Sequence, residues 1–152
     1  CGVVPNIYRL AEKGYQLTLS VSLHAPYDQK RAEIMPVNKA YPIAELMRAC
    51  RDYFKTTHRR ISYEYALIEG VNDKLDDADA LAELLKGQGC HINLIPVNPV
   101  VGTGYTKTGK KYAYAFRDRL IAKGFSCTIR RELGSEIDAA CGQLRRKDGA
   151  QA

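Results

Sequence analysis

Cys141 is the first candidate for chemistry in this sequence. It lies in the run Ile137-Asp-Ala-Ala-Cys-Gly-Gln-Leu144. Ser135 and Asp138 are typical of a helix N-cap followed by an acidic first turn, and Gly142 can end such a turn. A cysteine here is either a small buried apolar residue or a nucleophile, and free cysteine is more often buried. The local sequence leaves both alternatives open.

Three other polar side chains follow apolar segments that predict strands. Ser22 and His24 end an alternating segment, and Asn98 lies between two prolines after a second apolar segment. The carboxyl ends of parallel strands meet at one edge of a sheet, where the sites of α/β proteins lie. Taken singly, each could be an outward-facing serine, a structural imidazole or a turn-capping asparagine. A parallel topology would gather all three with Cys141.

Cysteine and histidine spacing argues against a zinc site. The chain has five cysteines and three histidines, scattered and without a Cys-x2-Cys pair or a Cys/His pair at zinc spacing. We therefore expect reduced thiols in a cytoplasmic protein. No apolar run is long enough to span a bilayer, so we expect no membrane partner.

Positive charge is concentrated in residues 101–131. The formal net charge is +6, yet residues 1–100 hold 12 basic and 12 acidic side chains, while 101–131 hold eight basic and one acidic. Concentrated positive charge favours a phosphate-bearing partner, and a solvated helix face is the alternative. The candidates for contacts with the phosphates of such a partner are Lys107, Lys110, Lys111, Arg130 and Arg131.

A phosphate-loop motif is nearly matched by Gly104-Tyr-Thr-Lys-Thr-Gly-Lys-Lys111. Lys111 replaces the hydroxyl residue that holds magnesium in that motif, and the preceding strand ends well before the loop. We therefore do not expect nucleotide hydrolysis. The same basic, glycine-rich loop can contact nucleic-acid phosphates with fewer requirements.

Helix and strand patterns alternate along the chain. We expect helices over 5–13, 42–54, 76–86 and 111–123, and strands over 17–23, 60–68, 92–97 and 127–133. The connections are long enough for parallel crossovers, which indicates an α/β fold with a parallel sheet. We expect one domain over residues 1–144 and a basic, disordered tail over 145–152.

Four motifs resemble the carboxyl-terminal part of the RlmN family. In the family's order they are Cys1-Gly-Val-Val-Pro5, Ser22-Leu-His-Ala-Pro26, Ile92-Asn-Leu-Ile-Pro-Val-Asn-Pro99 and Ile137-Asp-Ala-Ala-Cys-Gly-Gln-Leu144. Members are radical-SAM enzymes that methylate carbon 2 of an adenine in 23S ribosomal RNA and, in some bacteria, in transfer RNA. The similar Cfr enzymes methylate carbon 8. The resemblance implies the later half of a partial (β/α) radical-SAM barrel.

The resemblance also implies residue roles. Cys141 would carry the methyl group as S-methylcysteine, and contacts to S-adenosylmethionine would come from Ser22, Leu23, His24 and Asn98. One S-adenosylmethionine would methylate the Cys141 thiolate. A second, cleaved at a 4Fe-4S cluster, would yield the radical that activates the S-methyl group. The implied partners are 23S ribosomal RNA, transfer RNA in some members, and an electron donor.

Much of the family's pattern does not occur in this sequence. The sequence does not contain the Cys-x3-Cys-x2-Cys motif that binds the cluster or the Gly-Glu segment that contacts S-adenosylmethionine. It also contains neither the amino-terminal RNA-binding region nor the second catalytic cysteine, which resolves the methylated adduct. We therefore expect cluster ligands upstream of this chain and a fragment that is inactive alone. Half a barrel would leave an unpaired strand edge, which favours self-association. The alternative is a catalytically silent RNA-binding module that uses the basic segment 101–131.

Overall fold

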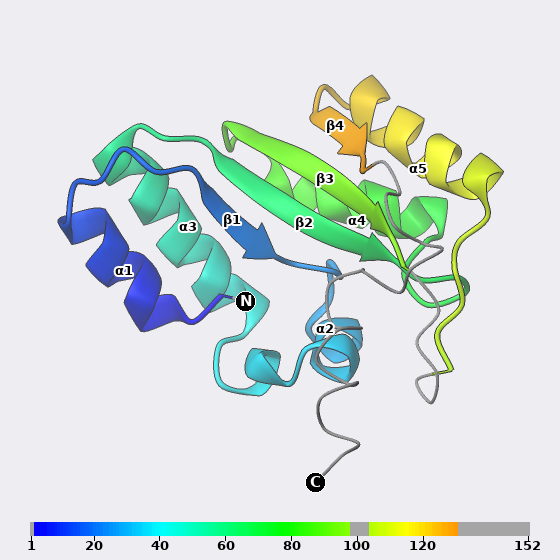
Figure 1. Ribbon diagram of the computed structural model, residues 1–152, viewed down its shortest axis with the longest axis horizontal. Coiled ribbons are helices and arrows are strands. Elements are labelled where there is room, and N and C mark those ends of the chain that lie inside the picture. The colour runs from blue at the N-terminus through cyan, green and yellow to red at the C-terminus, as the bar shows by residue number, and fades with distance from the viewer. Residues whose placement is uncertain (1, 98–103, 131–152) are drawn as a thin grey trace, which may run out of the picture.

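Four parallel strands form one sheet in the computed structural model, which describes residues 2–97 and 104–130. The strand order is β1-β2-β3-β4 (Figure 1). The strands are β1 (Leu19–Ser22), β2 (Ile61–Leu67), β3 (Cys90–Pro96) and β4 (Ser126–Ile129). Every neighbouring pair is parallel, which confirms the predicted α/β fold with a parallel sheet.

The four helices that the sequence predicted are present, together with two short helices that it did not predict. The four expected helices are α1 (Val4–Glu12), α3 (Ile43–Thr57), α4 (Leu75–Leu85) and α5 (Lys110–Ala122). The sequence did not predict α2 (Asp28–Ile34) and the short 3-10 helix η1 (Pro36–Lys39) after β1. The only buried residue of α2 is Arg31, so the helix has no apolar stripe from which to predict it. None of the described helices is long and apolar enough to cross a membrane.

One face of the sheet packs against helices and holds the core. Along β2, Ile61, Tyr63, Tyr65 and Leu67 are buried, and they alternate with half-buried residues. The Tyr65 ring lies 5.3 Å from the Phe116 ring of α5. Right-handed crossovers between parallel strands that follow one another in the sheet place the connecting helices on the same face. The core therefore lies between this face and the helices α3, α4 and α5.

Helix α3 lies between the sheet and α1, which runs beside it in Figure 1. The apolar stripe of α3 is buried at Ile43, Leu46, Met47, Cys50 and Tyr53. Phe54, at the end of the expected helix 42–54, is 36% exposed and lies outside the core.

Candidate active site at the carboxyl edge of the sheet

Ser22 and His24 lie at the carboxyl end of β1, as the parallel topology predicted. His24 has a φ of 61°, a left-handed backbone conformation that is uncommon for residues other than glycine. Its ring Nδ1 accepts a hydrogen bond of 3.0 Å from the Ala66 N–H, at the end of β2. Because Nδ1 accepts, the proton of the neutral ring is on Nε2, which is then a hydrogen-bond donor.

His24 is neutral at physiological pH. Burial and the nearby positive charge of Arg31 lower its pKa from 6.5 to about 4. A neutral imidazole does not repel a cationic ligand, and its Nε2–H can donate to a hydroxyl, carboxylate or ring nitrogen of that ligand. This side chain suits binding and orientation better than proton transfer near neutral pH.

Asn72 fixes the backbone around His24. Its Nδ2 donates to the carbonyl oxygens of His24 and Ala66, each at 2.7 Å, and its Oδ1 accepts from the Ile68 N–H at 2.8 Å. The Asn72 side chain is wholly buried. One amide side chain thus ties the ends of β1 and β2 together, so the unusual backbone at His24 is held by tertiary contacts.

Arg31 of α2 supports the same segment from the core side. Its Nε donates to the Leu23 carbonyl at 3.1 Å, its Nη2 to the Ser22 carbonyl at 3.3 Å, and its Nη1 to Asn38 Oδ1 at 2.7 Å. Arg31 is wholly buried. A buried arginine that binds two consecutive carbonyl oxygens fixes the backbone of the Ser22–His24 segment. Helix α2, which the sequence did not predict, therefore positions Ser22 and His24, which the sequence predicted as site residues.

Leu23 faces the core and not the edge of the sheet. Its side chain is fully buried, its N–H donates to the Glu64 carbonyl at 2.9 Å, and its carbonyl accepts from Arg31. Ser22 and His24 therefore face away from the core, and the buried Leu23 between them holds the segment in place.

The face of the sheet opposite the core helices carries cross-strand rows of polar side chains. In one row Ser22 pairs with Glu64, and Glu64 with Asn93. The Glu64 carboxylate accepts from Asn93 Nδ2 at 2.8 Å and from Ser62 Oγ at 3.2 Å. Sequence reasoning missed this row, although the alternation of polar and apolar residues along 61–67 and 90–94 contains its signal.

A second row surrounds His91. Its ring nitrogens lie 2.9 Å from Ser126 Oγ and 2.9 Å from Thr128 Oγ1 on the neighbouring strand. Burial and Arg60 lower the pKa of His91, which favours the neutral ring. The row therefore adds hydroxyl and imidazole groups, and Glu64 supplies the carboxylate of this polar face.

These groups fit S-adenosylmethionine better than a metal cluster. A sulfonium cation with ribose hydroxyls and an adenine suits a site with one carboxylate, a serine hydroxyl and a neutral imidazole donor. Within the residues that the structure describes, no group of three or more His, Cys, Asp or Glu side chains could hold a metal ion. Burial raises the pKa of Cys50 and Cys90 to about 11 and that of Cys127 to about 12, so these thiols are poor ligands for a cluster.

Three of the predicted phosphate-contact residues line one groove between α5 and β4. The groove has a volume of about 740 Å³, and Lys107, Lys110 and Arg130 lie in its wall. Lys111 does not line it. Sequence reasoning missed Tyr114 and Arg117, which line the groove from α5.

The near match to a phosphate loop does not form one. Thr108 is buried and its Oγ1 donates to Asp73 at 2.9 Å, so its hydroxyl is used within the protein. The strand β3 ends at Pro96 and α5 begins only at Lys110. The tight strand–loop–helix turn of nucleotide-hydrolysing proteins is therefore replaced by a long connection.

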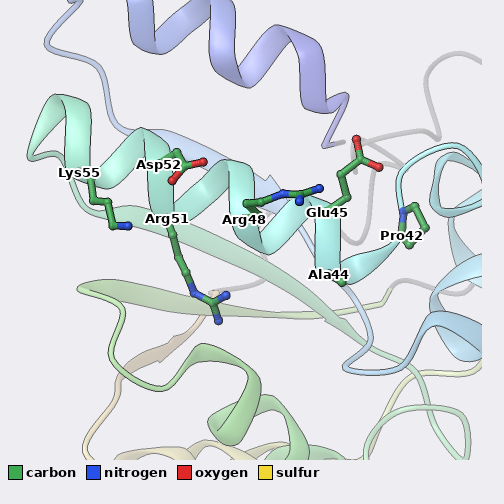
Figure 2. Close-up of a pocket in the computed structure, with 7 residues that line it drawn as sticks. All are labelled: Pro42, Ala44, Glu45, Arg48, Arg51, Asp52 and Lys55. Carbon is green, nitrogen blue, oxygen red and sulfur yellow. The ribbon is translucent and has the colours of Figure 1, made fainter.

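A second hollow follows the outer side of α3 and contains none of the predicted residues. Figure 2 shows its lining side chains along this single helix and the proline before it. They are Pro42, Ala44, Glu45, Arg48, Arg51, Asp52 and Lys55. Basic and acidic side chains are interspersed, which is typical of a solvated helix face.

The other predicted site residues, Asn98, Cys141 and Arg131, lie outside the described residues. Their roles stay predictions.

Comparison with known proteins gives one consistent relationship. No family model matches, but the chain is 56% identical over 147 residues to a protein of Thermoanaerobacter sp. (strain X514) named "Probable dual-specificity RNA methyltransferase RlmN". A protein of Clostridioides difficile (strain 630) with the same name is 52% identical over 147 residues. Both alignments cover 97% of this chain and 43% of the relative, so the chain spans less than half of their length.

Two solved structures share the fold. A radical SAM methyltransferase from Sphaerobacter thermophilus matches 93% of this chain and 42% of its own, with a TM-score of 0.91 and 46% identity. A domain of pyruvate-formate lyase-activating enzyme from Bacteroides vulgatus has a TM-score of 0.65 at 16% identity, covering 84% of this chain and 74% of its own, which shows the fold alone. The resemblance that the four motifs indicated is confirmed, and this chain belongs to the RlmN family, as a carboxyl-terminal segment of it.

Proposed function

We propose that the complete protein carrying this chain is a radical-SAM RNA methyltransferase that methylates carbon 2 of an adenine in 23S ribosomal RNA. Transfer RNA is the second candidate substrate. The observation that carries the proposal is the 56% identity, over 97% of the chain, to a protein named as an RNA methyltransferase of this family. Residues 1–144 would form one unit of its barrel and 145–152 a basic tail, in a cytoplasmic protein.

Cofactor binding would use the carboxyl edge of the sheet. In this proposal Ser22 and His24 contact S-adenosylmethionine through the serine hydroxyl and the imidazole Nε2–H. Leu23 contributes by anchoring the segment, and Asn98 contacts the same ligand from the chain after β3. The neutral state of His24 and the carboxylate of Glu64 support a cationic ligand at this place.

Cys141 would carry the methyl group. Its thiol loses a proton, and the thiolate sulfur then attacks the methyl carbon of S-adenosylmethionine. A new sulfur–carbon bond forms at Cys141 while the sulfonium–methyl bond breaks, which gives S-methylcysteine and S-adenosylhomocysteine. When bound, the 4Fe-4S cluster, with an electron donor and a second S-adenosylmethionine, would supply the radical chemistry that transfers this carbon to adenine.

The cluster would need ligands from elsewhere in the complete protein. The sequence contains no Cys-x3-Cys-x2-Cys motif, and the described cysteines do not fit the group. We therefore propose that the chain is inactive by itself. Among the described strands β1 lies at an edge of the sheet, and pairing at that edge would allow self-association of the isolated chain.

The basic segment would contact RNA phosphates. The proposed residues are Lys107, Lys110, Lys111, Arg130 and Arg131. The basic groove between α5 and β4 also supports the alternative function, a catalytically silent RNA-binding module.

Substitution of Cys141 separates these two functions. In cells whose only copy of the gene encodes Cys141→Ala, 2-methyladenosine should disappear from digested 23S ribosomal RNA when it is measured by mass spectrometry. Cys90→Ala is the matched control, since the half-buried Cys90 has no proposed role, and it should keep the modification. An unchanged 2-methyladenosine level in the Cys141→Ala cells would contradict the catalytic role of this residue.

A further inference from the structure

We infer that the groove between α5 and β4 binds a single-stranded segment of RNA, with a phosphate among its basic side chains and a base stacked on Tyr114. This inference rests on the proposed function for the choice of RNA as the polyanion. It goes beyond the predicted phosphate contacts because it names a bounded site with a separate place for the base.

The charge of the groove is of one sign. Lys107, Lys110, Arg117 and Arg130 line it, and none of its described lining residues is acidic. Arg117 donates through Nε and Nη2 to Asp118 at 2.8 and 2.6 Å, but Asp118 lies outside the groove wall. A groove wall whose charged side chains are all basic raises the local concentration of a polyanion.

The start of α5 strengthens this positive potential. Its N-cap, Gly109, makes no side-chain hydrogen bond, and the first turn of the described helix holds no acidic residue. Lys110 and Lys111 occupy that turn instead. Helix N-termini carry a partial positive charge that normally favours acidic side chains, so two lysines at this position leave the charge available to an outside anion.

Tyr114 provides a surface for stacking. It is 49% exposed although it lines the groove, and the Arg117 guanidinium carbon lies 4.7 Å from the centre of its ring. An aromatic ring beside a stacked arginine is the arrangement with which proteins bind single-stranded nucleic acid, because every base has a flat face to stack.

The groove also lies where substrate RNA could reach the proposed active site. It is lined by Pro96 and Arg130, which mark the carboxyl ends of β3 and β4. Ser22 and His24 lie at the same edge of the sheet, at the end of β1. Three strand spacings separate β1 from β4, or about 14 Å, a distance that one RNA strand can span.

RNA-binding affinity tests the inference. We would measure the Kd of the complete holoenzyme for a labelled RNA hairpin with an adenine-containing loop, by fluorescence anisotropy over a range of salt concentrations. Tyr114→Ala should weaken binding about tenfold, while Tyr114→Phe, which keeps the ring, should bind like wild type. Lys110→Ala should reduce the slope of log Kd against log salt by about one. Lys55→Ala on the outer side of α3 is the matched control and should leave the slope unchanged.

The outcomes separate this inference from the proposed function. If wild-type protein methylates RNA but Tyr114→Ala and Lys110→Ala bind RNA as tightly as Lys55→Ala, the groove inference is wrong and the methyltransferase proposal stands. If RNA is not methylated yet binding depends on Tyr114 and Lys110, the groove inference stands alone. Equal loss of affinity in Tyr114→Phe and Tyr114→Ala would also contradict base stacking.

Discussion

Replacing Asn72 with alanine is predicted to destabilise the protein by about 3–5 kcal/mol. The substitution removes the donors to the His24 and Ala66 carbonyls and the acceptor for the Ile68 N–H. An unpaired buried backbone group costs about 1–3 kcal/mol, and three groups are affected. The lower part of the summed range applies because a water molecule can enter the space that alanine leaves.

Two further variants separate the contributions of Asn72. Tyr65→Phe removes only the hydrogen bond of 2.8 Å from Tyr65 to the Asn72 carbonyl and should cost about 1 kcal/mol. Asn72→Asp keeps an acceptor for the Ile68 N–H but places a carboxylate against two carbonyl oxygens. This contact raises the pKa of the new carboxyl in the folded state, so stability should fall as the pH rises above about 4, the ordinary pKa of aspartate.

Urea unfolding followed by circular dichroism gives these differences in the free energy of unfolding. Hydrogen exchange provides a local reading, since the Ile68 amide should lose protection in Asn72→Ala before the amides of β3 do. A loss below about 1 kcal/mol in Asn72→Ala, with Ile68 still protected, would refute the view that this side chain ties β1 to β2.

Three more predictions follow from the same structure. Because the pKa of His24 is lowered from 6.5 to about 4, its neutral ring contributes up to about 3 kcal/mol to the free energy of unfolding. This contribution is present above pH 6.5 and is lost as the pH falls through 4. His24→Asn keeps an acceptor and tolerates the left-handed backbone, so it should show less of this loss in urea unfolding between pH 7 and 4.5. Iodoacetamide at pH 8 should leave Cys50 and Cys127 unlabelled in the folded protein and label both in urea, because burial raises the pKa of each thiol to about 11 or above. Arg31→Met should lower the free energy of unfolding by about 3–5 kcal/mol, since it leaves three acceptors without their donor, and Arg31→Lys should recover only part of the loss.

Each of these three has an outcome that would count against it. The His24 prediction fails if wild type and His24→Asn lose the same stability between pH 7 and 4.5. Rapid labelling of Cys50 in folded protein would show that the core between α3 and β2 opens readily. Full stability of Arg31→Met would mean that its hydrogen bonds only compensate the cost of burying its charge.

The order of helices and strands could be predicted from the sequence because hydrophobic periodicity decides it locally. The stripe of α3 and the alternation of β2 are examples, and the parallel topology placed Ser22 and His24 at one edge of the sheet. Helix α2 could not be predicted in this way. Its single buried side chain is the charged Arg31, whose partners are backbone carbonyls and Asn38.

Hydrophobic periodicity could not predict the detail of the candidate site either, because that detail depends on contacts between residues far apart in the chain. The tautomer of His24 depends on the Ala66 amide, and its backbone is held by Asn72, which is 48 residues further along the chain. The groove beside α5 has a similar origin, since Tyr114 and Arg117 join Arg130 only when α5 packs beside β4. The composition of the sequence identifies the basic segment 101–131, but the packing of α5 against β4 determines which of its side chains share a surface.

Mass spectrometry of the Cys141 peptide tests the central claim most directly. The complete protein would be expressed in cells together with its electron-donor system, purified and digested, and the peptide that contains Cys141 compared with the peptides of Cys50 and Cys90. The account predicts one added methyl group on Cys141 and none on the other two cysteines. An unmodified Cys141 in protein that methylates RNA would contradict the role of this residue as the methyl carrier.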